Sequence, residues 1–233
     1  MEEFIKRRFY NKLNDDKGKR IFAQGYCFAK IFVFFCIGCI VGTYYEEILT
    51  LCTKGVWESR SGLIYGPFNP IYGFGFAGFI AILGRNIKGR KWYFTYFWSC
   101  FIGGVAEFLL SWIGEMLFNA TSWDYTGYFL NIGGRTTVPF MLFWGVGGMV
   151  IMYILYPLLS KIIEKVPFKV GKVVYPILLV FMILNMIVSY TALFRQANRK
   201  AGKNPMTFIG EICDNIYTDE YLYKIYPNMV HNK

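Results

Sequence analysis

Long apolar runs separated by short polar joints dominate the pattern of the chain. A helix needs about 20 apolar residues to cross a bilayer. Five runs reach or approach that length, at about 28–51, 63–84, 92–118, 137–160 and 173–194. They are apolar on all sides, as expected of helices surrounded by lipid or protein. The pattern predicts an all-α, polytopic membrane helix bundle of about five spans.

The second run is irregular at its start. Residues 63–75 contain Pro67 and Pro70 together with three glycines. Proline removes a backbone N–H and breaks a regular helix. Such backbone is tolerated at membrane depth only where protein or a water-filled cavity covers it. We therefore expect a broken or re-entrant segment near 64–72 that leads into a helix.

The third run carries carboxylates inside an apolar helix. Glu107, Ser111 and Glu115 are spaced at i, i+4 and i+8, which places them on one helix face. A charge near the bilayer centre costs about 2.5–3.5 kcal/mol on insertion scales, and such residues usually face a partner, a cavity or a pathway. This face is the first candidate for function.

Composition and charge support a membrane protein and set its expected orientation. The chain is 55% hydrophobic and 17% charged, whereas soluble domains carry about 25% charged residues. The net charge of +10 comes from clusters in the joints, so it indicates topology rather than nucleic-acid binding. The joints at 85–91 and 161–172 and the N-terminus are expected in the cytoplasm of a bacterial cell. A cluster after the last span opposes this orientation, because five crossings would put it outside: Arg195, Arg199, Lys200 and Lys203.

The predicted organisation has three parts. Residues 1–27 form a basic, cytoplasmic N-terminal segment, 28–194 the transmembrane helical domain, and 195–233 a polar, aromatic tail. The tail is expected to form a short helix against the membrane surface. Membrane lipids are the expected surroundings of the whole chain.

Cysteine and histidine usage excludes several kinds of chemistry. The cysteines lie mostly in apolar runs, where a free thiol behaves as a small hydrophobe. His231 is the single histidine, so histidine-based metal sites and Ser-His-Asp catalysis are not expected. Gly73, Gly75 and Gly78 match a dinucleotide-binding string, but no strand precedes them. We expect neither a metal nor a cofactor.

Further ionisable and polar residues gather at the predicted outer ends of the spans. We expect them to form one polar cavity that opens outward, or else a structural ion-pair network. The candidates for acid–base or cation chemistry are Glu107, Glu115 and Glu46, because a buried carboxylate can bind a cation or move a proton. Arginine suits phosphate or carboxylate, and the candidates for substrate binding are Arg60, Asn69, Glu107, Trp123, Asp124, Tyr125, Asn131 and Arg135.

Ordered motifs at these positions carry a family resemblance. They are the segment 62–75 around Tyr-Gly-Pro, the two glutamates at 107 and 115, Trp-Asp-Tyr at 123–125, Asn-Ile-Gly-Gly-Arg at 131–135 and Phe-Trp-Gly at 143–145. From about residue 35 to 160 the chain resembles the ABC-transporter permease family of CmpB-type membrane proteins in Firmicutes. Thr43 and Ser59 depart from the family pattern, which expects Trp and Asn. The resemblance implies a permease and, as partner, an ATPase or another membrane subunit.

Three functions remain open from the sequence. The first is a permease-like protein with an extracytoplasmic-side intramembrane site for a small ion, solute or anionic headgroup. The second is a membrane-embedded enzyme that acts on a lipid headgroup, with a carboxylate as base and arginines as anion ligands. The third is a non-catalytic accessory subunit. Discontinuous backbone often lines transport sites, which favours the first.

Overall fold

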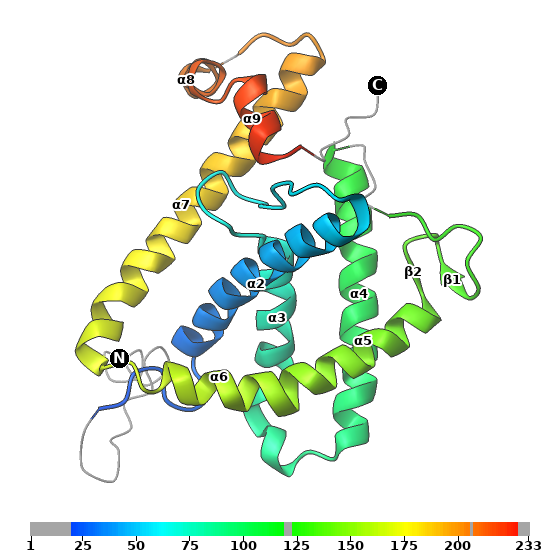
Figure 1. Cartoon of the computed structure of the whole chain (residues 1–233), viewed down its shortest axis with the longest axis vertical. Helices are drawn as coiled ribbons and strands as arrows, with labels where there is room; N and C mark the ends of the chain where they lie inside the picture. The colour runs from blue at the N-terminus through cyan, green and yellow to red at the C-terminus, as the bar shows by residue number, and fades with distance from the viewer. Residues whose placement is uncertain (1–19, 119–122, 206, 228–233) are drawn as a thin grey trace. The chain divides into compact units, whose positions relative to one another are not determined.

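The protein is almost entirely helical. The computed structural model describes residues 20–118, 123–205 and 207–227, and the predicted basic N-terminal segment lies mostly outside them. Four helices are long and apolar enough to cross a membrane: Phe28–Lys54, Trp92–Met116, Val138–Ile163 and Phe168–Lys200. These helices confirm the predicted all-α membrane helix bundle (Figure 1).

The second predicted run contains a shorter helix than the sequence suggested. Helix α3 covers only Pro70–Leu83, while residues 55–69 are not helical. Pro70 begins the helix because the first turn does not need its N–H. The predicted break is therefore present, but the helix after it is 14 residues long. At 1.5 Å per residue, it extends about 21 Å, less than the thickness of a hydrocarbon core.

The chain divides into two compact units, each described here by itself. The first comprises Met1–Phe35 and Gly75–Tyr175, and the second comprises Cys36–Phe74 and Pro176–Lys233. Helices α2 (Phe28–Lys54), α3 and α7 (Phe168–Lys200) each contribute residues to both units.

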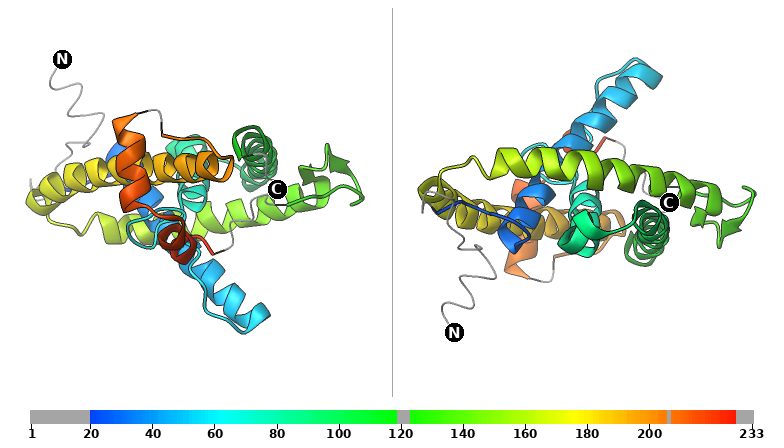
Figure 2. Two further views of the ribbon diagram at one scale, coloured as in Figure 1. Left: turned by 90° about the horizontal axis from the view of Figure 1, so that it is seen from above. Right: turned by 90° about the horizontal axis from the view of Figure 1, so that it is seen from below.

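The first unit is built around the pair α4 (Trp92–Phe118) and α5 (Val138–Val150), which pack against each other. Helix α5 continues through a π-helical turn, η2 (Ile151–Leu155), into α6 (Tyr156–Ile163), so that the three form one rod (Figure 2). A 3-10 segment, η1 (Gly84–Gly89), links α3 to α4. The core of the unit includes Phe34, Ile80, Leu83 and Met152.

Three segments predicted to be cytoplasmic meet at one end of the first unit. The Tyr26 hydroxyl donates to the carbonyl of Ala81 at 2.5 Å, near the end of α3. Lys30 makes an ion pair with Glu164, at the end of α6. The beginning of α2, the joint after α3 and the joint after α6 therefore share one end, as the charge pattern requires.

The second unit contains a folded C-terminal tail. Helices α8 (Phe208–Ile216) and α9 (Asp219–Ile225) begin at the N-caps Thr207 and Thr218, whose side chains accept backbone hydrogen bonds. A buried cluster joins them to the last turns of α7 and to the broken segment: Ile64, Ala192, Leu193, Cys213, Tyr217, Leu222 and Tyr226.

The broken segment is fixed by side chains of α7. Ile64 N–H donates to Ser189 Oγ at 2.9 Å, and Asn185 exchanges two hydrogen bonds with the backbone of Tyr65. Asn185 and Ser189 are both buried. Buried polar groups of a span thus satisfy the non-helical backbone, as apolar surroundings demand.

Candidate intramembrane polar site

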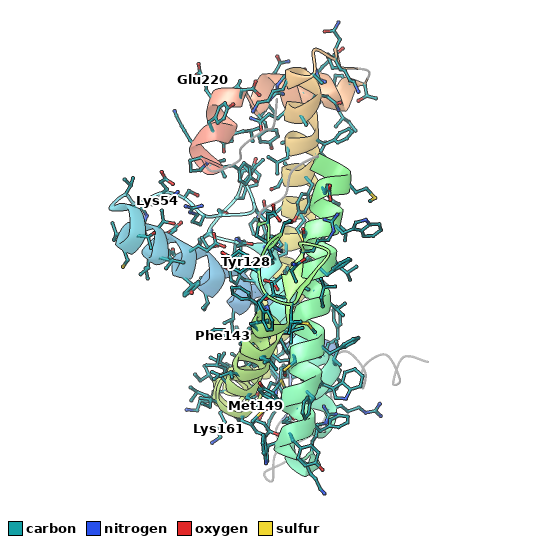
Figure 3. All side chains as sticks on the ribbon, turned by 90° about the vertical axis from the view of Figure 1, so that its right-hand side faces the viewer. Lys54, Tyr128, Phe143, Met149, Lys161 and Glu220 are labelled. Atoms are coloured by element: carbon teal, nitrogen blue, oxygen red, sulfur yellow. The ribbon has the colours of Figure 1, made fainter. Side chains whose placement is uncertain are left out.

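A short hairpin between α4 and α5 builds the centre of the site. Strand β1 (Asn131–Ile132) pairs with β2 (Thr136–Thr137), and Gly133 and Gly134 turn the chain with φ of +59° and +67°. Glycine adopts this left-handed conformation without strain. The hairpin carries Arg135 and Thr136 to the side of α4. Figure 3 labels Tyr128, which lies in the same connection.

Glu107 of α4 accepts hydrogen bonds at both carboxylate oxygens. The Tyr125 hydroxyl donates to Oε1 at 2.9 Å, and the Thr136 hydroxyl donates to Oε2 at 2.7 Å. Thr136 is 2% exposed and Glu107 is partly buried. Both donors are neutral, and no lysine or arginine in the described ranges forms an ion pair with Glu107. A hydrogen bond to a charged group contributes about 1.5–3 kcal/mol. The free energy gained from the two hydroxyls is therefore similar in size to the cost of inserting the carboxylate into a membrane, and offsets it.

Arg135 is paired with the next acid along α4. It makes an ion pair with Glu115, and its Nη1 donates to Ser111 Oγ at 3.3 Å. Its guanidinium also lies 5.9 Å from the centre of the Phe108 ring. Ser111 is buried, whereas Glu115 is about half exposed. The predicted polar face of α4 is therefore occupied, with Glu107 and Glu115 in different surroundings.

The position along α4 separates the two glutamates further. At 1.5 Å per residue, Glu107 lies about 22 Å and Glu115 about 34 Å from the beginning of the helix at Trp92. The hydrocarbon core of a bilayer is about 30 Å thick. A helix that begins at the membrane surface thus carries Glu107 inside the core and Glu115 at the far interface.

Three other predicted residues shape the connection itself. Trp123 Nε1 donates to the Arg135 carbonyl at 2.9 Å. Asn131 donates to the Tyr128 carbonyl at 3.0 Å and accepts from Gly134 N–H at 3.1 Å, which fixes the hairpin turn. Asp124 accepts from Thr126 N–H at 2.8 Å. Trp123 and Asn131 therefore hold the hairpin around Arg135, whereas Asp124 fixes the preceding turn at Thr126.

Two groups of the connection have shifted pKa values. Burial, and then the hydrogen bond to Glu107, raise the pKa of Tyr125 to about 12. The Tyr125 hydroxyl therefore remains a proton donor to Glu107 throughout the physiological range. Hydrogen bonds from Thr126 lower the pKa of Asp124, which keeps this exposed carboxylate ionised.

The other predicted residues belong to the second unit, around the end of α2. Arg60 donates from Nε to Thr50 Oγ1 at 2.9 Å and lies 3.7 Å from Glu58. Asn69 is buried and donates to the Arg60 carbonyl at 3.3 Å. Glu46 is hydrogen-bonded to Tyr72. The predicted set thus falls into two groups, one in each unit.

Sequence reasoning found the charged members of the first group but missed Thr136 and the pairing pattern. It left open whether Arg135 binds an anion or belongs to an ion-pair network, and in the structure Arg135 contacts Glu115 and Ser111. One feature of the sequence could have indicated Thr136: it is a polar residue that directly follows Arg135 and stands just before an apolar run. In the part of the chain that the structure covers, no group of three His, Cys, Asp or Glu residues could hold a metal ion.

Comparison with known proteins identifies the family. The model of the family described as "Putative ABC-transporter type IV" (ABC_trans_CmpB) matches residues 33–190. Comparison with curated proteins finds no match, and comparison with solved structures finds none either. The matched range contains α3, α4, the hairpin and α5. It also contains the end of α2 and the segment after it, so every residue of both polar groups lies within the match. Because it extends over more than half of the sequence, the chain belongs to this ABC-transporter type IV family, and it is a permease-like membrane protein.

Proposed function

We propose that this permease-like protein binds a proton or a small cation at Glu107, within the membrane. One observation supports the proposal: Glu107, on a helix long and apolar enough to cross a membrane, accepts hydrogen bonds from two neutral hydroxyls. No ion pair with a described residue compensates its charge, so a proton or cation is the partner that would lower its energy most in apolar surroundings.

The pairing of the arginines favours a cation over an anionic headgroup. Arg135 contacts Glu115 and Ser111, and Arg60 contacts Thr50 and Glu58. An anionic substrate would have to displace these partners. The same pairing gives less support to an enzyme that holds a lipid headgroup with arginines.

The rest of the proposal concerns the setting of the site. We infer from the basic joints that the N-terminus is in the cytoplasm of a bacterial cell, which would put Glu107 in the extracytoplasmic half of the membrane. The family description also implies a separate ATPase or other membrane subunit as partner. The chain itself has no ATP-binding P-loop.

Infrared difference spectroscopy on the reconstituted protein tests the proposal without the partner. We expect a carboxyl C=O band that appears as the pH is lowered and that is missing from Glu107→Gln. If a cation competes with the proton, added Na⁺ or K⁺ should move the midpoint of this band to lower pH. Glu115→Gln is the matched control, because it makes the same change two helical turns away and should keep the band. A band that survives in Glu107→Gln would overturn the proposal.

A further inference from the structure

A basic, aromatic groove lies at the opposite end of α4 from Glu107. It has a volume of about 900 Å³ and opens between the end of α3 and the beginning of α4. Its charged lining comes from Arg85, Arg90 and Lys91, and its aromatic lining includes Tyr26, Phe94 and Tyr156. The groove belongs to the first unit alone and shares no residue with the proposed Glu107 site.

The cations of the groove have no acidic partners. Neither Arg85, Arg90 nor Lys91 forms an ion pair with an acidic side chain of the described residues. Glu164 approaches the edge of the groove by accepting from Gly25 N–H at 3.0 Å, but it is already paired with Lys30. Among the described residues, no acidic side chain compensates the charge of these three cations, whereas Arg135, near the other end of α4, is paired with Glu115.

Arg90 gives the sharpest indication of a ligand. Its Nη1 is buried, and no acceptor in the described ranges takes a hydrogen bond from it. Its guanidinium lies 5.2 Å from the centre of the Phe94 ring, which holds the side chain against the wall. A buried guanidinium nitrogen without an acceptor is costly, and a phosphate oxygen is the acceptor that guanidinium geometry matches best.

The position of the groove indicates where the phosphate comes from. The groove lies between the end of the apolar helix α3 and the beginning of the apolar helix α4, which starts at Trp92. Tryptophan and tyrosine typically sit at the headgroup level, and basic pockets there bind anionic lipid headgroups. The aromatic walls suit the glycerol and upper acyl carbons of such a lipid.

We propose that the groove lined by Arg85, Arg90 and Lys91 binds the phosphate headgroup of an anionic phospholipid. Arg90 supplies the buried donor, while Arg85 and Lys91 supply exposed charge. The ring of Tyr26 packs against Gly84, 3.3 Å from where a Cβ would stand.

Native mass spectrometry of the purified full chain, titrated with phosphatidylglycerol or phosphatidylcholine, tests the proposal. We expect a preference for phosphatidylglycerol that Arg90→Gln weakens at least tenfold, since a charge-assisted hydrogen bond of roughly 1.4 kcal/mol or more corresponds to that factor. Arg20→Gln is the matched control, because Arg20 is exposed and also lies over a ring, that of Phe168, at 5.9 Å. We expect it to change the affinity less than twofold.

The other outcomes decide against the proposal. Equal losses in Arg90→Gln and Arg20→Gln would show attraction to general surface charge rather than a built groove. Competition by inorganic phosphate without any preference for phosphatidylglycerol would assign the groove to a soluble phosphate. If Arg90→Gln does not fold, Lys91→Gln, which alters an exposed side chain, should still weaken phosphatidylglycerol binding, and unchanged binding there would overturn the proposal.

Discussion

Single residues in this protein show two ways of keeping a charge in apolar surroundings. Glu107 accepts from two neutral hydroxyls, whereas Arg195 at the end of α7 is paired with Asp214 through two nitrogens, at 2.8–3.0 Å. The first arrangement gives Glu107 no ion pair among the described residues, as the proposed binding of a proton or cation requires. The second neutralises the charge and gives Arg195 a structural role, which accounts for a basic residue where the orientation rule does not expect one.

The Asp214 pair makes the stability of the C-terminal helices dependent on pH. The hydrogen bond from Arg195 is the largest cause that lowers the pKa of Asp214. A lowered pKa in the folded state gives stability that is complete above the unfolded value of about 3.9 and is lost as the pH falls through the folded value. We expect the thermal midpoint in detergent to fall as the pH drops below about 4.

Asp214→Asn should remove this dependence and leave Arg195 and Arg199 without their shared partner. Because Asp214 is partly exposed, we expect a loss of about 2 kcal/mol at neutral pH, less than the roughly 3–5 kcal/mol of a broken pair that is fully buried. Glu220→Gln is the control, because Glu220 is exposed and forms no ion pair with another described residue. A thermal midpoint in Asp214→Asn equal to that of the wild type at pH 7 would contradict the assigned role.

Helices in this protein pack closely where small residues meet large ones. A Cβ at Gly148 of α5 would overlap the side chain of Ser99 on α4, and one at Gly103 would overlap that of Trp144. The neighbouring Gly147 has open space around its Cβ position. Small residues let helices approach within membranes, where lipid supplies no hydrophobic drive for association.

Two alanine substitutions on adjacent residues test this packing. Gly148→Ala should lower the thermal midpoint, because Ser99 or the α4 backbone must move. Gly147→Ala should leave the midpoint unchanged or raise it, since alanine favours a helix over glycine by about 0.8–1 kcal/mol. Differential scanning fluorimetry in one detergent compares both variants, and equal effects of the two would contradict close α4–α5 contact at Gly148.

Helix α8 has an apolar side that the rest of its unit does not cover. Its exposed residues include Phe208, Ile209, Ile212 and Ile216. Helix α8 runs across α7 (Figures 1 and 2). Its residue Asp214 accepts a hydrogen bond from Arg195, which is the first charged residue after the apolar stretch 173–194 of α7, so α8 lies beside the end of that stretch. That stretch extends about 33 Å and fills the hydrocarbon core. The level of α8 corresponds to the depth at which headgroups are expected.

We therefore expect α8 to lie in the membrane interface, as the sequence suggested for the tail. A fluorophore sensitive to polarity, attached at Ile209→Cys in a Cys52→Ser background, should emit at shorter wavelength in lipid nanodiscs and be quenched by headgroup-labelled lipids. The same label at Glu211→Cys, on the polar side, should be quenched less. Equal quenching at both positions would exclude an interfacial α8.

At the scale of the whole molecule, the sequence predicted the helical class, the break before α3 and the long apolar helices. Hydrophobic run length carries this information directly, because each lipid-facing helix must satisfy its backbone internally. The length of α3 was less predictable, since apolar residues 63–69 bind α7 through backbone groups instead of continuing a helix. Partners in polar groups were also out of reach, because pairing of Arg135 with Glu115 rather than Glu107 depends on the hairpin turn.

The central claim is that Glu107, unlike Glu115, is a carboxylate inside the hydrocarbon core. Labelling of membranes with a lipid-soluble carbodiimide, followed by peptide mass spectrometry, tests it directly, because such reagents attack protonated carboxyl groups in apolar surroundings. We expect modification at Glu107, less at high pH, and none at Glu115, which is half exposed and paired with Arg135. An unmodified Glu107, or equal modification of the two residues, would contradict the account.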